Sequence, residues 1–200
     1  MTISKIIVQT SRVPPQQYIV DMIMEYSPGW QYQHFDDKQV INFFLSNPLN
    51  EFPYVIQKFF SFSYGEHRAD LFRYYYLYVK GGVYFDTDAM IECNIDNIVK
   101  EYDYFSVNST YFPGSIFQGF IGASPRHPII YNGLKDIYNI DNSELIAKPE
   151  NFHDICRNMY KFVNEFNGPG KIKLYKEVYS TPEIAAVVDT EDNNKLVLNH

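Results

Sequence analysis

Residues 66–88 have the sequence EHRADLFRYYYLYVKGGVYFDTD, and this stretch carries most of the information about the fold. From Glu66 to Val79 it contains good helix formers and no internal Gly or Pro, so it predicts a helix. The two glycines that follow end the helix, because Gly adopts the left-handed conformation of a C-terminal cap at little cost. Three apolar residues then predict a short strand. We therefore expect Asp86 and Asp88 to lie at the carboxyl end of a buried strand.

The segments on either side predict alternating strands and helices. The β-branched run 3–9 is typical of a buried parallel strand, and Pro14-Pro15 opens a helix that ends near Tyr26. Asp36-Asp37 caps the helix after the next strand. The remaining expected elements are strands at 30–35, 102–107, 117–123 and 196–198, helices at 38–45, 127–138 and 149–163, and a partly helical segment at 51–63. This order predicts an α/β fold with a Rossmann-like, mostly parallel central sheet flanked by helices.

Length, charge and composition limit the class of protein. Two hundred residues indicate a single domain, 1–200. The net charge of −7 comes from 17 basic and 24 acidic residues without a basic stripe, which argues against nucleic acid as a partner. Cys93 and Cys156 form no CxxC motif, in keeping with a reduced compartment.

The apolar runs of the chain are short. The N-terminal run is too short for a signal peptide, and no stretch has the ~20 apolar residues of a membrane span. We expect a cytoplasmic location without a membrane span in this chain, with an anchor in a longer parent protein as the alternative. The sequence does not define the oligomeric state.

The Asp86-Thr87-Asp88 motif suggests a metal site. On an extended segment, carboxylates at i and i+2 face the same side about 6–7 Å apart, and at an effective dielectric near 20 they repel by roughly 2–3 kcal/mol. A hard divalent cation such as Mg²⁺ or Mn²⁺ neutralises such a pair and leaves positions open for phosphate oxygens. Open α/β sheets also bind ligands at the carboxyl ends of their strands. An ordinary acidic turn is the alternative for an isolated motif of this kind.

The preceding helix carries a second polar set. Asp70, Arg73 and Tyr74 are spaced at i, i+3 and i+4, so they share one face of the helix. They form either a solvent-facing ion pair or a site in which Asp70 accepts hydrogen bonds from sugar hydroxyls and Arg73 orients it.

The motifs Ala69-Asp70-x-x-Arg73, Gly81-Gly82 and Asp86-x-Asp88 occur here in the order found in glycosyltransferase family 32, which this chain resembles. That family includes initiating α-mannosyltransferases, inositol-phosphoceramide mannosyltransferases and capsule enzymes, and it is similar to the glucosylating clostridial toxins. Weaker agreement extends to Ile3–Thr10, to Gln118–Pro128 and to Gly168-Pro169, so the resemblance covers most of the chain.

This resemblance implies a GT-A type nucleotide-diphospho-sugar transferase fold and a retaining hexosyltransferase that uses Mn²⁺ or Mg²⁺. The donor would be a nucleotide sugar, with UDP-hexose favoured over GDP-mannose. The acceptor would be a glycan, a lipid or a protein hydroxyl. Residues 1–90 would form the nucleotide-sugar-binding half, and residues 91–200 the acceptor-side half.

The resemblance also implies roles for individual residues. Asp88 would be the main metal ligand, and Asp86 would contact ribose, sugar or metal. Asp70 and Arg73 would hold the donor hexose. The expected catalytic set is thus Asp86, Asp88, Asp70 and Arg73, and the expected donor-binding set is Gln9, Thr10, Asp70, Arg73, Tyr74 and Asp86.

Two positions depart from the family pattern. Val8 and Ser11 stand where a His and an aromatic residue are common, so a base-stacking ring would have to come from Tyr18 or Trp30. A late metal ligand is also typical of the family. His200 is the late candidate here, with a disordered chain end as the alternative.

The mechanism and the class of protein both have alternatives. We expect front-face attack within an ion pair, because the carboxylates that double displacement would need, Glu66, Asp70 or Asp103, are not distinguished by the sequence. A catalytically inactive nucleotide-sugar or glycan-binding module is one alternative to an enzyme. A haloacid-dehalogenase-type phosphatase is another, although Met90 stands where that class has Thr or Val.

Overall fold

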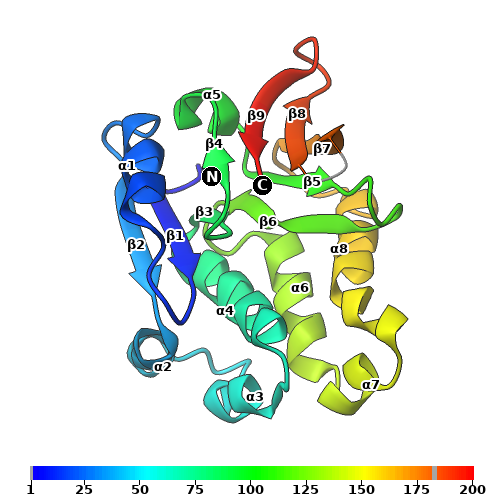
Figure 1. Cartoon of the computed structure of the whole chain (residues 1–200). Coiled ribbons are helices and arrows are strands. Elements are labelled where there is room, and N and C mark those ends of the chain that lie inside the picture. Colours follow the sequence, from blue (N-terminus) through cyan, green and yellow to red (C-terminus); the bar gives the residue numbers. More distant parts are fainter. Residues whose placement is uncertain (1, 182–183) are drawn as a thin grey trace.

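The computed structural model describes residues 2–181 and 184–200, and its central feature is a nine-stranded sheet covered by helices (Figure 1). The strand order is β2-β1-β3-β6-β5-β7-β8-β9-β4. The strands are β1 (Ile6–Thr10), β2 (Gln31–Phe35), β3 (Gly82–Phe85), β4 (Met90–Ile91), β5 (Tyr104–Asn108), β6 (Ile116–Ala123), β7 (Ile172–Thr181), β8 (Ile184–Asp189) and β9 (Lys195–Asn199). The helices are α1 (Gln17–Glu25), α2 (Asp37–Ser46), α3 (Val55–Ser61), α4 (Gly65–Lys80), α5 (Ile95–Val99), α6 (Pro128–Asn139), α7 (Asn142–Ile146), the 3-10 helix η1 (Pro149–His153) and α8 (Asp154–Asn164).

The predicted fold class is confirmed, with a sheet that is mixed in its pairing. β1 pairs in parallel with β2 and β3, and β5 pairs in parallel with β7. The other neighbours are antiparallel, so β6, β8 and β4 oppose the direction of the remaining six strands. Most strands therefore run in one direction, but the parallel pairs fall into two groups separated by β6.

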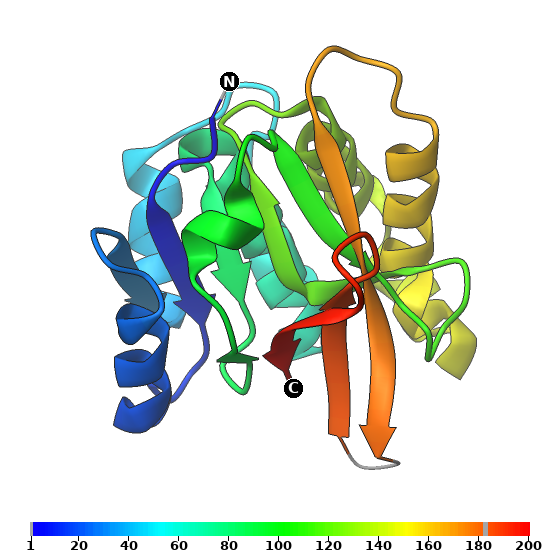
Figure 2. The ribbon, with the colours of Figure 1, turned by 90° about the horizontal axis from the view of Figure 1, so that it is seen from above.

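The sheet separates two hydrophobic cores, and Figure 2 shows helices on both of its faces. The larger core, here called the α4-side core, contains Tyr84 of β3 together with apolar side chains of α2, α3, α4, α6 and α8. The α1-side core contains Val83 and Phe85 of the same strand, together with side chains of α1 and α5. Successive strand residues thus point to opposite faces, as expected for a strand buried on both sides.

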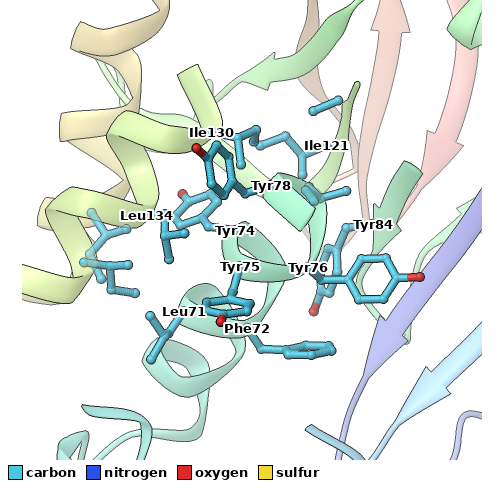
Figure 3. Close-up of a cluster of buried hydrophobic side chains, with 14 of the residues drawn as sticks. Leu71, Phe72, Tyr74, Tyr75, Tyr76, Tyr78, Tyr84, Ile121, Ile130 and Leu134 are labelled. Atoms are coloured by element: carbon cyan, nitrogen blue, oxygen red, sulfur yellow. The ribbon is translucent and has the colours of Figure 1, made fainter. Parts of the chain in front are cut away.

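Helix α4 is buried on all sides. Residues 70–78 are buried without interruption, so the helix has no solvent-facing stripe in this part. Figure 3 shows Tyr74 and Tyr78 near Ile130 and Leu134 of α6, with Tyr76 on the other side of the helix. The tyrosine-rich sequence suits this position, because a ring can pack while its hydroxyl bonds a polar neighbour. The Tyr76 hydroxyl, for example, donates to Gln33 at 2.7 Å.

Glycines set the connection from α4 to β3. Gly81 and Gly82 have φ values of 67° and 114°, so the predicted glycine end of the helix is confirmed. The predicted cap of α2 is also confirmed: the Asp36 carboxylate accepts from the backbone N–H of Gln39 at 2.8 Å, and the Gln39 side chain accepts from the backbone N–H of Asp36.

Several C-terminal elements differ from the sequence-based expectation. The predicted helix 149–163 is a 3-10 turn followed by α8, and α7 precedes it. Strands β7 and β8 were not predicted. In β7, Lys173 and Glu177 occupy buried positions, which interrupts the apolar alternation that marks a strand. No helix in the described residues is long and apolar enough to cross a membrane.

Candidate active site

Asp86 follows β3 directly and begins a tight turn. The backbone N–H of Ala89 donates to the Asp86 carbonyl at 3.1 Å, so the Asp86-Thr87-Asp88 segment is not extended as predicted. The prediction failed because this turn hydrogen bond forms where β3 ends. The Asp86 carbonyl also accepts from Gln9 Nε2 at 2.9 Å, and the backbone N–H of Asp86 donates to the Gly119 carbonyl at 2.8 Å. Side chains and backbone from β1 and β6 therefore fix the backbone of Asp86.

Arg73 links helix α4 to this turn. Its guanidinium lies 3.1 Å from Asp70 Oδ1 and 3.7 Å from Asp86 Oδ1. It also donates to the Gln118 carbonyl and lies over the ring of Tyr84, 4.3 Å from its centroid. Arg73 is 4% exposed and Asp70 8%, so the alternative of a solvent-facing pair is wrong.

The buried charges of this cluster depend on one another. Burial raises the pKa of Asp70, and the positive charge of Arg73 opposes that rise. Burial by itself would lower the pKa of Arg73, but Tyr84, Asp70 and Asp86 raise it above its ordinary value. Arg73 thus stays charged between two carboxylates, one buried and one half-exposed at the end of the sheet.

The other expected donor-binding residues act within the protein. Gln9 is fully buried and its amide oxygen accepts from the Tyr32 hydroxyl at 2.7 Å. The Thr10 hydroxyl donates to the Phe35 carbonyl at 2.9 Å. Tyr74 is fully buried and donates to the Gln118 side chain. These contacts join β1 to β2 and α4 to β6 beside Asp86.

The expected metal ligands do not converge on one point. Asp88 is exposed within the turn, and Asp86 faces Arg73. Among residues 2–181 and 184–200, no group of three or more His, Cys, Asp or Glu side chains could hold a metal ion. The acidic residues of the motif would therefore need oxygens from a bound ligand to complete a coordination sphere.

His200 is held at the edge of the site. Its backbone N–H and carbonyl pair with Ala185 at 3.0 and 3.2 Å, so the chain end is ordered by β8. The imidazole stacks on Phe117 with 4.1 Å between ring centroids, and its Nε2 lies 3.4 Å from Glu177 Oε1. These contacts contradict the alternative of a disordered chain end.

Three other positions considered from the sequence are not part of the buried cluster, although Glu66 lies one helical turn before Asp70 and its charge helps to raise the pKa of Asp70. Asp103 precedes β5, which pairs with the Ala123 end of β6, whereas Asp86 bonds to Gly119 at the other part of that strand. Glu66 is exposed in the first turn of α4. Trp30 is buried in the α1-side core with its N–H donating to Asp96, so it offers no face to a nucleotide base.

Strand β6 contributes site residues that sequence reasoning missed. A Cβ on Gly119 would collide with both Asp86 Oδ2 and the Phe117 ring, so this glycine makes room for the carboxylate. Gln118 contacts Arg73 and Tyr74 from the same strand. A glycine inside a predicted strand often marks a close approach, and that was the available indication. The register that places Gly119 beside Asp86 is a tertiary property.

The sequence and fold were compared with known proteins. Residues 14–105 match the family described as a glycosyltransferase sugar-binding region containing a DXD motif. A mannosyl phosphorylinositol ceramide synthase of Saccharomyces cerevisiae is 28% identical over 139 residues, which are 68% of this chain and 35% of the relative. The initiation-specific alpha-1,6-mannosyltransferase of the same yeast is 39% identical over 72 residues, covering 36% of this chain and 15% of the relative.

A solved structure supports the fold independently. The PaToxG glycosyltransferase superimposes with a TM-score of 0.52 at 16% identity, covering 81% of this chain and 73% of that one. The matched region 14–105 contains Asp70, Arg73, Asp86 and Asp88, the four residues of the predicted catalytic set. The resemblance stated from the sequence is confirmed: residues 14–105 of this chain, with the DXD motif, are similar to the DXD-containing glycosyltransferases.

Proposed function

We propose that this chain transfers a hexose from a nucleotide-diphosphate sugar to an acceptor hydroxyl, with retention of configuration at the anomeric carbon. The observation that carries the proposal is the position of Arg73. A buried guanidinium between Asp70 and Asp86 joins the helix and the DXD turn in one charged cluster at the end of β3. The family match over the same residues supports a donor sugar as its ligand.

The residues of the motif suit a divalent cation shared with the donor. Asp88 is exposed and has no ion-pair partner in the described part of the chain, so its oxygens are available. Carboxylate and phosphate oxygens are the ligands that Mn²⁺ and Mg²⁺ prefer. Asp88 and Asp86 would hold such an ion, with His200 a further expected ligand, and the ion would supply charge stabilisation to the departing diphosphate.

The side chains of the cluster favour one of the two possible retaining mechanisms. In the transfer step, the bond from the anomeric carbon to the diphosphate breaks and its electron pair goes to the diphosphate. The acceptor oxygen forms the new bond, and its proton goes to the leaving diphosphate. Of the three carboxylates considered for double displacement, only Asp70 lies in the cluster, and Arg73 already occupies its Oδ1 at 3.1 Å. This pairing favours front-face attack.

Donor and acceptor identity are the finer parts of the proposal. The Ala-Asp-x-x-Arg pattern favours a UDP-hexose, whereas the relatives are named for mannosyl transfer, so GDP-mannose is the second donor to test. The segment shared with this chain is 35% of the ceramide synthase and 15% of the initiation-specific mannosyltransferase, so this chain spans only part of either relative. A glycan, lipid or protein hydroxyl remains the class of acceptor.

A donor panel tests this function. UDP-glucose, UDP-galactose, UDP-N-acetylglucosamine and GDP-mannose are each incubated with Mn²⁺, Mg²⁺ or EDTA, and nucleotide release is measured for the wild type and Asp88→Asn. We expect metal-dependent release from one donor and a loss of at least 100-fold in Asp88→Asn, because a charge-stabilising group of this kind contributes about 10²–10³ in rate.

The alternatives give different results in the same panel. An inactive binding module would show thermal stabilisation by a donor without release or transfer. A phosphatase would hydrolyse 4-nitrophenyl phosphate vigorously while ignoring nucleotide sugars. Either result, or a wild-type protein that responds to no donor, contradicts the proposal.

A further inference from the structure

A pocket lies next to the DXD site, on the other side of Phe117 and Gln118 of β6. It has a volume of about 290 Å³ and is formed by the 109–118 segment, η1 and α8, the end of β7 and the chain end. Ligand pockets range from about 300 to 1,000 Å³, so its size suits one small ring rather than a long chain. We call it the β7 pocket.

The β7 pocket shares a wall with the DXD site. Phe117 and Gln118 line the pocket, and the carbonyl of Gln118 accepts from Arg73. The side chains of Phe117 and Asp86 flank the space that Gly119 leaves open. A molecule in the pocket would therefore contact Phe117 and Gln118, the two residues of β6 that precede Gly119 and its close approach to Asp86.

Aromatic rings form the rim of the pocket. Tyr111 is 65% exposed and Tyr179 43%, although both are large apolar rings. Their centroids lie 6.0 Å apart, and Tyr111 also contacts Phe112 at 4.6 Å. Exposed rings gathered at one pocket are a common feature of binding sites. They offer flat apolar surfaces on which the C–H face of a sugar ring can stack.

Polar groups form the floor. The Glu177 carboxylate accepts from the Ser109 hydroxyl at 2.6 Å and from the N–H of Thr110 at 2.9 Å. Its Oε1 atom also lies 3.4 Å from Nε2 of His200. Apart from this contact with Glu177, the buried Nε2 atom of His200 has no hydrogen-bond partner among the described residues. A ligand hydroxyl can satisfy it.

The charge of the pocket favours a neutral acceptor over an anionic one. Its lining contains the carboxylate of Glu177, the imidazoles of His153 and His200, and neither Lys nor Arg among the described residues. A phosphate or phosphoinositol headgroup would meet a buried negative charge without a cationic partner, which is unfavourable. A neutral ring with hydroxyl groups would meet hydrogen-bonding groups on the floor and aromatic faces on the rim.

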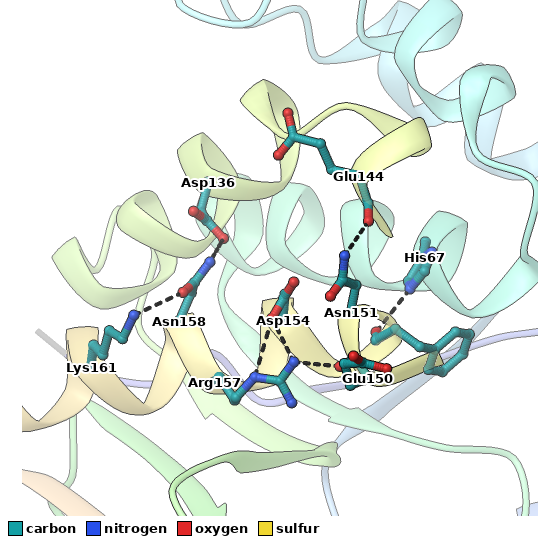
Figure 4. A network of polar contacts seen from close by, with 10 residues as sticks. His67, Asp136, Glu144, Glu150, Asn151, Asp154, Arg157, Asn158 and Lys161 are labelled. Atoms are coloured by element: carbon teal, nitrogen blue, oxygen red, sulfur yellow. Dashed lines mark hydrogen bonds and ion pairs between the residues drawn. The ribbon is translucent and has the colours of Figure 1, made fainter. Parts of the chain in front are cut away.

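We propose that the β7 pocket is the acceptor subsite and that it binds a neutral pyranose, the terminal sugar of a glycan. This inference rests on the proposed transferase activity for its role, but the pocket can be tested without turnover. Loop 109–115 carries the Tyr111 ring. Helix α8 and the preceding η1 supply the opposite wall. Asn158 of α8 donates to Asp136 of α6 at 3.0 Å, and Asn151 of η1 donates to the Glu144 carbonyl of α7 at 2.7 Å (Figure 4).

Binding of simple sugars tests the pocket directly. Methyl α-D-mannopyranoside, methyl α-D-glucopyranoside and methyl α-D-galactopyranoside are added to the full chain, and saturation-transfer NMR is recorded with myo-inositol 1-phosphate as the anionic comparison. We expect at least one pyranoside to bind and the phosphate to show at least tenfold weaker binding. Tyr111→Ala and Tyr179→Ala should each weaken pyranoside binding at least tenfold, whereas Tyr54→Ala, which removes another exposed tyrosine ring, should leave it unchanged.

Measuring donor turnover distinguishes a failure of this inference from a failure of the proposed function. Tyr54→Ala should leave nucleotide release from the donor unchanged, because its exposed ring lines neither the β7 pocket nor the Arg73 cluster. Pyranoside binding without any donor turnover would refute the transferase function but would still support sugar binding in the β7 pocket. The inference is overturned if no pyranoside binds, if binding survives both tyrosine substitutions, or if inositol phosphate binds as well as the sugars.

Discussion

Arg73 is the residue on which the candidate site depends most. Its removal leaves Asp70 as a buried carboxylate without its cationic partner, and breaking a buried pair in this way costs about 3–5 kcal/mol. We therefore expect Arg73→Ala to lower the free energy of unfolding by that amount in urea denaturation. The double variant Asp70→Ala/Arg73→Ala should be less destabilised than the sum of the two single variants, because each single change leaves a charge uncompensated.

An exposed ion pair provides the control for this cycle. Lys5 and Asp96 lie 3.1 Å apart with about half of each side chain exposed, so Lys5→Ala should cost less than about 1 kcal/mol. Additive effects at Asp70 and Arg73 would show that the two charges do not depend on each other, contrary to the geometry. Activity measurements alone would not make this distinction, since both residues lie at the site.

At the scale of elements, the passage from α4 to β3 places the DXD turn. Gly82 has φ 114°, and a Cβ there would lie 2.6 Å from the Ile6 carbonyl of the neighbouring strand. Backbone strain and overpacking each cost about 1–3 kcal/mol, so Gly82→Ala should lower the Tm by at least about 4 °C. Thermal unfolding followed by circular dichroism measures this shift.

Gly65, at the first residue of the same helix, is the matched control. A Cβ there has no atom within 4 Å and no positive φ is involved. Gly65→Ala should therefore raise stability by about 0.4–1 kcal/mol through the unfolded state. An equal effect of the two substitutions would mean that the contact between β3 and β1 does not control the placement of the turn.

The elements also show what the sequence could predict. Helix α4, its glycine end and β3 follow from local patterns, and these patterns contain Asp70, Arg73 and Asp86. The contributions of Gln118 and Glu177 depend on which strands become neighbours. That pairing joins residues far apart in sequence, so no local pattern encodes it. Strand β7 was missed for a related reason, because ion-paired Lys173 occupies a position where an apolar side chain would have marked the strand.

For the whole molecule, the expected halves 1–90 and 91–200 share their cores. β3 of the first half pairs with β6 of the second, and β4, which spans the boundary at residue 90, pairs with β9, so one continuous sheet contains strands of both halves. Helix α4 of the first half packs against α6 of the second in the α4-side core. A domain boundary near residue 90 would divide both the β3–β6 strand pair and the packing of α4 against α6. We infer that the chain unfolds as one cooperative unit.

The single tryptophan makes this inference testable. Trp30 lies in the first half, buried in the α1-side core, and Leu134 lies in the second half, fully buried on α6 across the sheet. Leu134→Ala should cost about 2–5 kcal/mol. In one cooperative unit, the urea midpoints from Trp30 fluorescence and from far-UV circular dichroism should fall together and by the same amount. Ile23→Ala, on the Trp30 side of the sheet, should shift both probes in the same way. If the Trp30 midpoint stayed in place while the circular dichroism midpoint fell in Leu134→Ala, the two halves would unfold separately, and the acceptor-side half would be an independent domain.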